Sequence, residues 1–178
     1  MLDYNDTVRI FPAAPEHTQR LLDLEQRTFR EAYGAHTRDE DIEAYIAASY
    51  SLKELSKELS DSGVNFFIGK LGRDYIGFVM LRQATARPDC VPDEGAVQLS
   101  RLYILKRFYG QGLGKSLLDK AVGHAVQNRH QTMWLSVWEK NTRALEFYRR
   151  QGFQRLGTQT FQVGSDPQKD IILGRMLE

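Results

Sequence analysis

Cysteine and histidine, the residues that most often form disulfides or hold metals, are scarce in this chain. There is one cysteine, Cys90, and the four histidines are scattered at His17, His36, His124 and His130. A single cysteine cannot form a disulfide within the chain, which is typical of a reducing compartment. The histidine spacing does not match a zinc site. The sequence therefore predicts no metal and a cytoplasmic location.

The chain also lacks a long apolar run and an excess of charge of one sign. No stretch approaches the roughly 20 apolar residues that span a bilayer. The first six residues have neither the basic start nor the apolar centre of a signal peptide. The 24 Lys and Arg against 23 Asp and Glu give a net charge of +1, which disfavours a nucleic-acid-binding protein. We therefore expect neither a membrane nor a nucleic acid as a partner.

What is present is the composition of a globular protein, with 42% hydrophobic and 26% charged residues. The 178 residues suit one domain, 1–178. The charge is unevenly distributed along it. Residues 1–60 hold seven Lys and Arg against twelve Asp and Glu, a net −5, while residues 61–178 carry +6. These charges either cover solvated helix faces or serve two partners of opposite charge.

Apolar periodicity predicts the secondary structure. Helices are expected over 16–33, 38–48, 51–59, 113–127 and 141–151, and strands over 7–11, 64–69, 75–81, 96–105, 132–138, 153–163 and 170–177. The order predicts an α/β (α+β) fold, in which helices flank a mixed, mostly antiparallel twisted sheet with a central β–α–β unit.

Three glycines at alternate positions join the predicted strand 96–105 to the helix 113–127: Gly110, Gly112 and Gly114. Glycine permits positive φ and leaves backbone N–H groups unshielded. A helix N-terminus adds free N–H groups and the positive end of the helix dipole. The turn is either a connection without function or an anion site suited to phosphate. Because so many glycines cost stability, we favour the anion site.

Two common phosphate-binding patterns do not fit this turn. A P-loop requires glycine where Tyr109 stands, and a dinucleotide site requires it where Lys115 stands. The run Arg107-x-x-Gly110-x-Gly112 does fit, and it resembles the [RQ]-x-x-G-x-[GA] signature of the GNAT superfamily of acetyl-CoA-dependent N-acetyltransferases.

A second motif supports the resemblance. Residues 141–153, NTRALEFYRRQGF, are similar to the superfamily pattern N-x-x-A-x-x-F-Y-x-[KR]-x-G-F, about thirty residues after the turn. With both motifs in this order, the chain is identified as a member of the superfamily over roughly 64–163. Residues 28–33, 102–106 and 134–141 also resemble the bacterial PaiA-type spermidine/spermine N-acetyltransferases.

The resemblance implies a GNAT-like domain that uses acetyl-CoA as cosubstrate and needs no metal. The cofactor-binding residues that it implies are Leu102, Tyr103, Ile104, Arg107, Gly110, Gln111, Gly112, Leu113, Gly114, Lys115, Ser116, Trp138, Asn141 and Arg150. A backbone N–H of 102–104 would polarise the thioester carbonyl. Asn141 either caps a helix only or also bonds the pantetheine arm. Arg150 either reaches a phosphate or is solvated.

Tyr148 is the candidate general acid. A phenol of pKa about 10 can protonate a leaving thiolate whose conjugate acid has a pKa of about 8.5. The alternative is core packing with Ala144, one helical turn earlier. The general base stays open, because Ser100 stands where many relatives have a glutamate. A water relay, Glu31 and Glu94 are the alternatives.

We therefore expect an enzyme that transfers acetyl from acetyl-CoA to a primary amine of a small cationic acceptor. Polyamines such as spermidine and spermine are favoured, with direct attack on the thioester. Acetylation of a protein or peptide amine and an acyl-CoA-binding regulatory module without turnover are alternatives. Residues 1–60 would shape the acceptor side, with Glu31 and Tyr33 as candidate contacts, and residues 64–178 the sheet and cofactor-binding core. The sequence leaves the acceptor, and the choice between monomer and homodimer, open.

Overall fold

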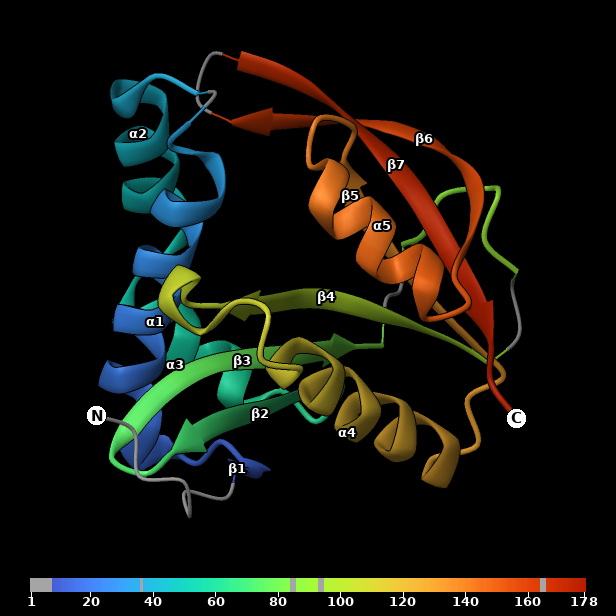
Figure 1. Cartoon of the computed structure of the whole chain (residues 1–178), viewed down its shortest axis with the longest axis horizontal. Helices are drawn as coiled ribbons and strands as arrows, with labels where there is room; N and C mark the ends of the chain where they lie inside the picture. The colour runs from blue at the N-terminus through green and yellow to red at the C-terminus, as the bar shows by residue number, and fades with distance from the viewer. Residues whose placement is uncertain (1–7, 36, 84–85, 93–94, 164–165) are drawn as a thin grey trace.

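One mixed sheet runs through the structure. The computed structural model describes residues 8–35, 37–83, 86–92, 95–163 and 166–178. Within these ranges seven strands follow the order β1-β2-β3-β4-β5-β7-β6 (Figure 1). The strands are β1 (Val8–Pro12), β2 (Val64–Leu71), β3 (Asp74–Arg82), β4 (Ala96–Ile104), β5 (Thr132–Trp138), β6 (Gln154–Val163) and β7 (Asp166–Met176). The helices are η1 (Pro15–His17), α1 (Thr18–Tyr33), α2 (Asp39–Ser49), α3 (Leu52–Ser60), η2 (Lys106–Phe108), α4 (Leu113–Gln127) and α5 (Thr142–Arg150).

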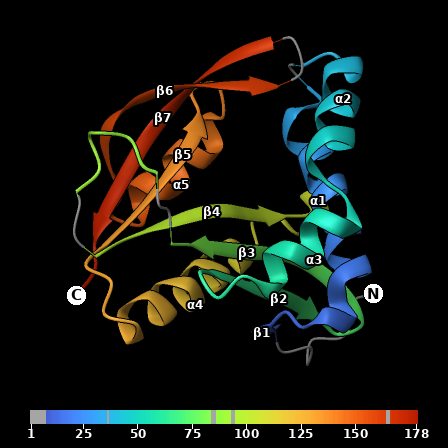
Figure 2. The same ribbon diagram turned by 180° about the vertical axis from the view of Figure 1, so that it is seen from behind.

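The sheet divides into two halves between β4 and β5. These two strands run parallel and pair only where residues 96–98 meet residues 132–134. The other neighbouring strands pair antiparallel. Beyond that short contact β4 and β5 diverge, which leaves a first half-sheet of β1–β4 and a second half-sheet of β5, β7 and β6 (Figures 1 and 2). The predicted mixed, mostly antiparallel sheet is confirmed.

A β-bulge marks the point at which β4 turns away. Met80 pairs with Arg101 and Leu81 with Leu99, so Ser100 is an extra residue in β4. A bulge bends its strand and increases the local twist. The bulge therefore helps β4 to leave β5 just after their last paired residues.

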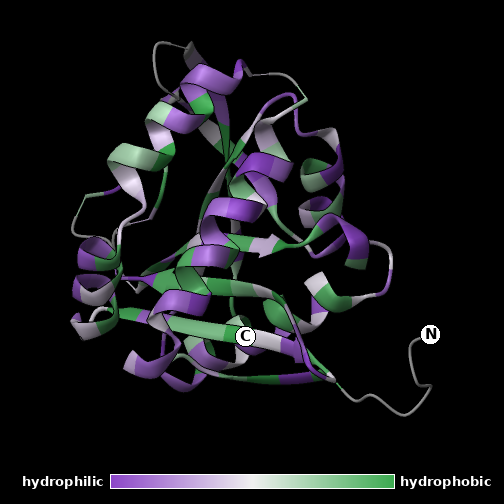
Figure 3. Cartoon of the chain, turned by 90° about the vertical axis from the view of Figure 1, so that its left-hand side faces the viewer, coloured by the Kyte–Doolittle hydropathy of each residue, from purple (hydrophilic) through white to green (hydrophobic). Residues whose placement is uncertain are grey.

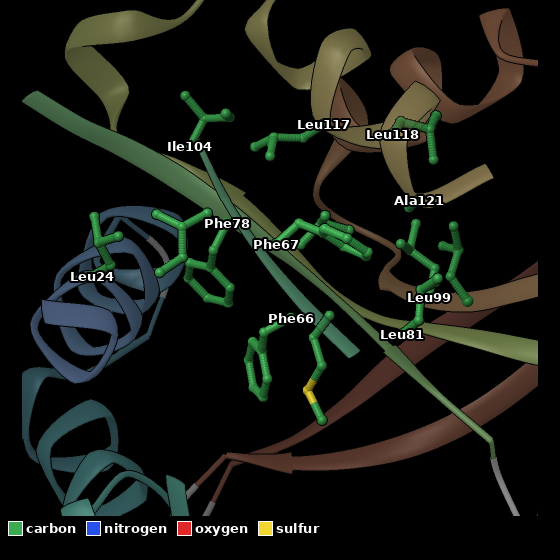
Figure 4. Close-up of a cluster of buried hydrophobic side chains, with 14 of the residues drawn as sticks. Leu24, Phe66, Phe67, Phe78, Leu81, Leu99, Ile104, Leu117, Leu118 and Ala121 are labelled. Atoms are coloured by element: carbon green, nitrogen blue, oxygen red, sulfur yellow. The ribbon is translucent and has the colours of Figure 1, made fainter. Parts of the chain in front are cut away.

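Helices cover both faces of the first half-sheet. The neighbouring residues Phe66 and Phe67 of β2 point to opposite faces, as pleating requires. The Phe67 ring lies 5.2 Å from that of His124 in α4, while α1 and α3 pack on the other face. Figure 4 shows Leu117 of α4 and Leu24 of α1 on either side of the strands. In Figure 3 the hydrophobic colour is concentrated on the central strands.

The helices begin and end close to the predicted positions. Ser51 caps α3, because its Oγ accepts a hydrogen bond from Glu54 N at 3.2 Å, as the sequence pair of Ser51 with Glu54 three residues later predicts. The last predicted strand begins earlier than expected, at Asp166 in place of Asp170. It lies between β5 and β6, so the final two strands are an antiparallel pair in which the last one is internal. In the described part of the chain no helix is both long and apolar enough to cross a membrane.

Candidate active site

A cleft of about 590 Å³ opens where β4 and β5 diverge. The end of β4, the glycine turn and α5 form its walls. The predicted site residues that line it are Leu102, Tyr103, Ile104, Gly110, Gly112, Leu113, Gly114, Lys115, Asn141, Tyr148 and Arg150. Two sequence motifs about thirty residues apart thus meet at one cavity. On its β5 side, β4 has no strand partner beyond residues 96–98, so the backbone groups on that edge can pair with an extended ligand.

The glycine turn keeps its backbone open toward a ligand. Gly110 and Gly112 have φ of +79° and +77°, and a Cβ added to either would meet no atom within 4 Å. Ser116 N donates the first backbone hydrogen bond of the helix, to Gly112 O at 3.2 Å. The N–H groups of residues 113–115 precede that bond, and no side chain caps this helix end. Such a helix N-terminus fits a phosphate.

Three cationic side chains line the same cleft. Lys115 pairs with Asp119 at 2.6 Å, and Arg150 pairs with Glu146 at 2.8 Å. The third, Arg143, was not predicted, and its guanidinium lies 3.8 Å from the centre of the Tyr109 ring. This contact joins the glycine turn to α5 across the cleft. The signature gives no hint of it, since Arg143 occupies a position that the pattern leaves free.

Three other predicted residues do not line the cleft, and their side chains bond to neighbouring protein groups. Arg107 pairs with Asp74 at 3.1 Å. Gln111 Nε2 donates to the Arg107 carbonyl at 3.4 Å, and Ser116 Oγ to the Gly112 carbonyl at 3.5 Å. The groups that this segment offers to a ligand are therefore its backbone N–H groups and glycines more than these three side chains.

A smaller inner cavity of about 70 Å³ adjoins the cleft. Leu102, Tyr103, Asn141, Ala144 and Tyr148 line both spaces. The remaining polar and aromatic side chains of the inner cavity come from α1, β4 and β5, namely Tyr33, Ser100, Arg101, Ser136 and Trp138. A space of this size has room for a slender group or a few waters.

Tyr148 lies at the junction of the cleft and the inner cavity. It is 8% exposed, and its ring packs against Phe147 and Phe153 with centroids 5.1 and 5.4 Å away. Burial raises the pKa of its phenol, and Tyr103 adds to the shift. Tyr148 therefore both packs in the core and lines the two cavities, and its phenol is protonated at neutral pH. Asn141 caps α5, because its Oδ1 accepts from Ala144 N at 3.1 Å.

Aromatic side chains form one wall of the inner cavity. Trp138 lines this cavity and not the cleft, although the resemblance suggested the cofactor side. Its ring stacks on Tyr33 at 5.7 Å, and Tyr33 and Tyr103 lie close enough to shift each other's pKa. α1, β4 and β5 therefore each contribute one ring.

Glu31, considered as a base, does not line these cavities. Glu31 accepts a hydrogen bond from Lys106 N at 2.7 Å and pairs with Arg27 at 3.5 Å, which ties α1 to η2. Glu94 lies outside the described residues. Ser100, at the bulge of β4, does line the inner cavity. No described group of three or more His, Cys, Asp or Glu residues could hold a metal.

Comparison with known proteins accounts for this arrangement. Residues 18–153 match the model of the Acetyltransferase (GNAT) family. The chain belongs to this family. It is 26% identical over 170 residues to an N-acetyltransferase encoded 3' of pepI in Lactobacillus delbrueckii subsp. lactis, which covers 96% of the chain and 98% of the relative.

One further sequence relative and one solved structure have names that state an activity. The spermine/spermidine N(1)-acetyltransferase of Bacillus subtilis is 37% identical over 68 residues, or 38% of this chain and 45% of that protein. The crystal structure of the PaiA N-acetyltransferase of Thermoplasma acidophilum in complex with coenzyme A superposes with a TM-score of 0.78. It is 21% identical and covers 96% of this chain and 99% of that one.

This GNAT acetyltransferase uses acetyl-CoA as its cosubstrate and is an N-acetyltransferase. The site fits that ligand on three counts: the open glycine amides, the cations around the cleft and the unpaired edge of β4. The expected fold, family and cosubstrate are thus confirmed. The roles of individual residues stay predictions.

Proposed function

We propose that this acetyltransferase acts on a primary amine of a small cationic acceptor, with polyamines first. The observation that carries the proposal is the aromatic wall of the inner cavity, formed by Tyr33, Tyr103 and Trp138. Aromatic faces attract ammonium groups, more strongly where water is excluded. The similarity over 68 residues to a spermine/spermidine N(1)-acetyltransferase supports the same acceptor class.

Acetyl-CoA supplies the activated acetyl thioester. On this proposal the N–H groups of the glycine turn and Lys115, Arg143 and Arg150 hold its phosphates. The open edge of β4 holds the pantetheine arm, and a backbone N–H of 102–104 polarises the carbonyl. Tyr148, whose phenol is kept protonated by burial, donates its proton to the leaving sulfur.

The acidic N-terminal part supports a cationic acceptor, but fewer of its charges are free than the sequence suggests. Glu25 is buried against Arg101 at 2.6 Å, and Asp41 is paired with Arg38 at 2.7 Å. Asp39 and Glu40, at the start of α2, are exposed. The proposed attraction of a polycation therefore rests on the first turn of α2.

A panel of amines tests the proposal by measuring CoA release. Spermidine, spermine, a linear monoamine and peptides with free N-termini are compared at equal concentration. We expect kcat/KM to be highest for the polyamines. A higher kcat/KM for a peptide would contradict the proposal and establish the protein-acetylating alternative.

A further inference from the structure

A buried carboxylate lies behind the inner cavity, on a strand outside both family motifs. Asp170 of β7 is 4% exposed and stands directly across from Trp138 of β5 in the antiparallel register. Its Oδ1 has no hydrogen-bond partner in the structure. A buried carboxylate with an unused oxygen is costly, so this position needs an explanation.

The surroundings of Asp170 link it to the reaction space. Ser136 of β5 lines the inner cavity and stands diagonally across from Asp170 in the strand register, where its hydroxyl partly offsets the rise that burial causes in the pKa of the carboxylate. Pleating places Ser136, Trp138 and Asp170 on one face of the second half-sheet. That face is turned toward α1, because Trp138 stacks on Tyr33. One serine therefore connects the carboxylate to the cavity in which the acceptor amine is expected.

The tyrosines around Asp170 are neutral at physiological pH, while Arg101, which also lines the inner cavity, is charged and paired with Glu25 and Glu58. Burial is the largest cause that raises the pKa of Tyr33 of α1, Tyr45 of α2 and Tyr103 of β4, and the charge of Asp170 adds a smaller rise to each. On its own strand Gln168 lies two residues away on the same face and donates to Thr37 at 3.0 Å. Burial raises the pKa of Asp170 to about 6, and the nearby Ser136 hydroxyl partly opposes that shift. The carboxylate is thus ionised at pH 7 yet a better proton acceptor than a solvated one.

We propose that Ser136 and Asp170 form the proton-accepting unit of this acetyltransferase, in which Ser136 contacts the acceptor amine and Asp170 acts through it. An alkylammonium of pKa about 10 must lose a proton before its nitrogen can attack. That proton passes to Ser136 while the Ser136 proton passes to Asp170, which leaves a neutral amine, an intact serine and a protonated carboxyl. The nitrogen then bonds to the acetyl carbon as the carbon–sulfur bond breaks. Tyr148 protonates the sulfur, the second nitrogen proton restores Tyr148, and Asp170 releases one proton to solvent.

The inference rests on the proposed amine acetylation but not on the polyamine preference. Its test uses the primary alkylamine that the wild-type enzyme acetylates with the highest kcat/KM. If polyamines are not the preferred acceptors, the amine panel will show a different ranking. The comparison of variants on this alkylamine still applies in that case.

The experiment compares two acceptors in Asp170→Asn and Ser136→Ala. One is the alkylamine, and the other is a weakly basic amine whose conjugate acid has a pKa below the assay pH. In Asp170→Asn we expect kcat/KM for the alkylamine to fall by about 100-fold and for the weakly basic amine by less than about fivefold. Ser136→Ala should show the same selectivity with a smaller loss. Glu139→Gln, whose carboxylate pairs with Lys169 on the surface at 3.7 Å, is the control and should be unchanged.

The pH profile gives an independent readout. In wild type, kcat/KM for the alkylamine should decline below about pH 6 as Asp170 becomes protonated, and Asp170→Asn should lack this decline. Equal losses for the two amines, or a raised KM with an unchanged kcat, would overturn the proposal. CoA binding and thermal melting confirm that each variant is folded. If Asp170→Asn does not fold, Asp170→Glu and Ser136→Ala are judged by the same amine criterion.

Discussion

Tyr33 of α1 and Trp138 of β5 stack with ring centroids 5.7 Å apart and planes inclined by 24°. α1 packs on the first half-sheet and β5 belongs to the second, so this pair connects the two halves beyond the point where β4 and β5 separate. Both rings line the inner cavity. The contact that supports the opened sheet is therefore also a wall of the proposed acceptor site.

Tyr148→Phe should lower kcat by about 100-fold and leave the affinity for CoA close to that of wild type. The phenol oxygen is the only atom lost, and the ring contacts with Phe147 and Phe153 remain. Steady-state kinetics and calorimetry with CoA measure the two effects. Tyr75→Phe is the matched control, since that ring packs under Arg20 and Lys70 away from the cleft. An unaltered kcat would remove Tyr148 from the mechanism.

Gly112→Ala should weaken acetyl-CoA binding on the order of tenfold while the protein still folds. A Cβ at this position meets no protein atom, but it projects into the space offered to the ligand. The positive φ adds a stability cost of about 1 kcal/mol. Gly123→Ala, in open space within α4, is the control and should instead stabilise by up to about 1 kcal/mol. CoA titrations with unchanged affinity for Gly112→Ala would show that the turn does not hold the cosubstrate.

Asp170→Asn should raise thermal stability at pH 8 but not at pH 4. Burial raises the pKa of Asp170 from 3.8 to about 6 in the folded protein. Between these values the folded state binds more protons than the unfolded state, so wild-type stability falls as the pH rises through this window. The cost above pH 6 is about 1 to 2 kcal/mol after solvent screening is allowed for. Melting curves across this pH range measure it, and a variant less stable than wild type at pH 8 would contradict the assignment.

The double variant Asp39→Asn with Glu40→Gln should raise KM for spermine by about two- to fivefold and KM for a monoamine less. The effect should fade in high salt, because both carboxylates are exposed and screened. Glu16→Gln with Asp23→Asn removes the same charge near the start of α1 and is the control. An equal rise in KM for both amines would show that this surface does not attract polycations.

The sequence predicted the structural features that are determined by residues close together in the chain. The glycine turn and the 141–153 motif predicted the cleft, because each segment adopts its shape from its own residues and the β–α–β order brings them together. Helix spacing and the Ser51 cap likewise predicted element positions from near neighbours.

Features that depend on strand order could not be predicted in this way. Asp170 faces Trp138 only because β7 inserts between β5 and β6, and nothing within residues 166–176 encodes that choice. The Arg143–Tyr109 contact likewise could not be predicted, because it depends on how close α5 lies to the glycine turn across the cleft. Successive side chains of β7 alternate between the two faces of the sheet. Asp170 can therefore be recognised as an inward-facing acid only once it is known which face is buried.

The open edge of β4 also bears on solubility. Free N–H and C=O groups along a strand invite the sheet of another copy to pair with them, which is a common route to aggregation. Here residues 99–104 lie within the molecule, between the diverging half-sheets and beside α5 and the glycine turn. A single extended chain can enter this space, but a second folded sheet cannot. The fold thus keeps a pairing edge open to an extended ligand while hiding it from neighbouring proteins.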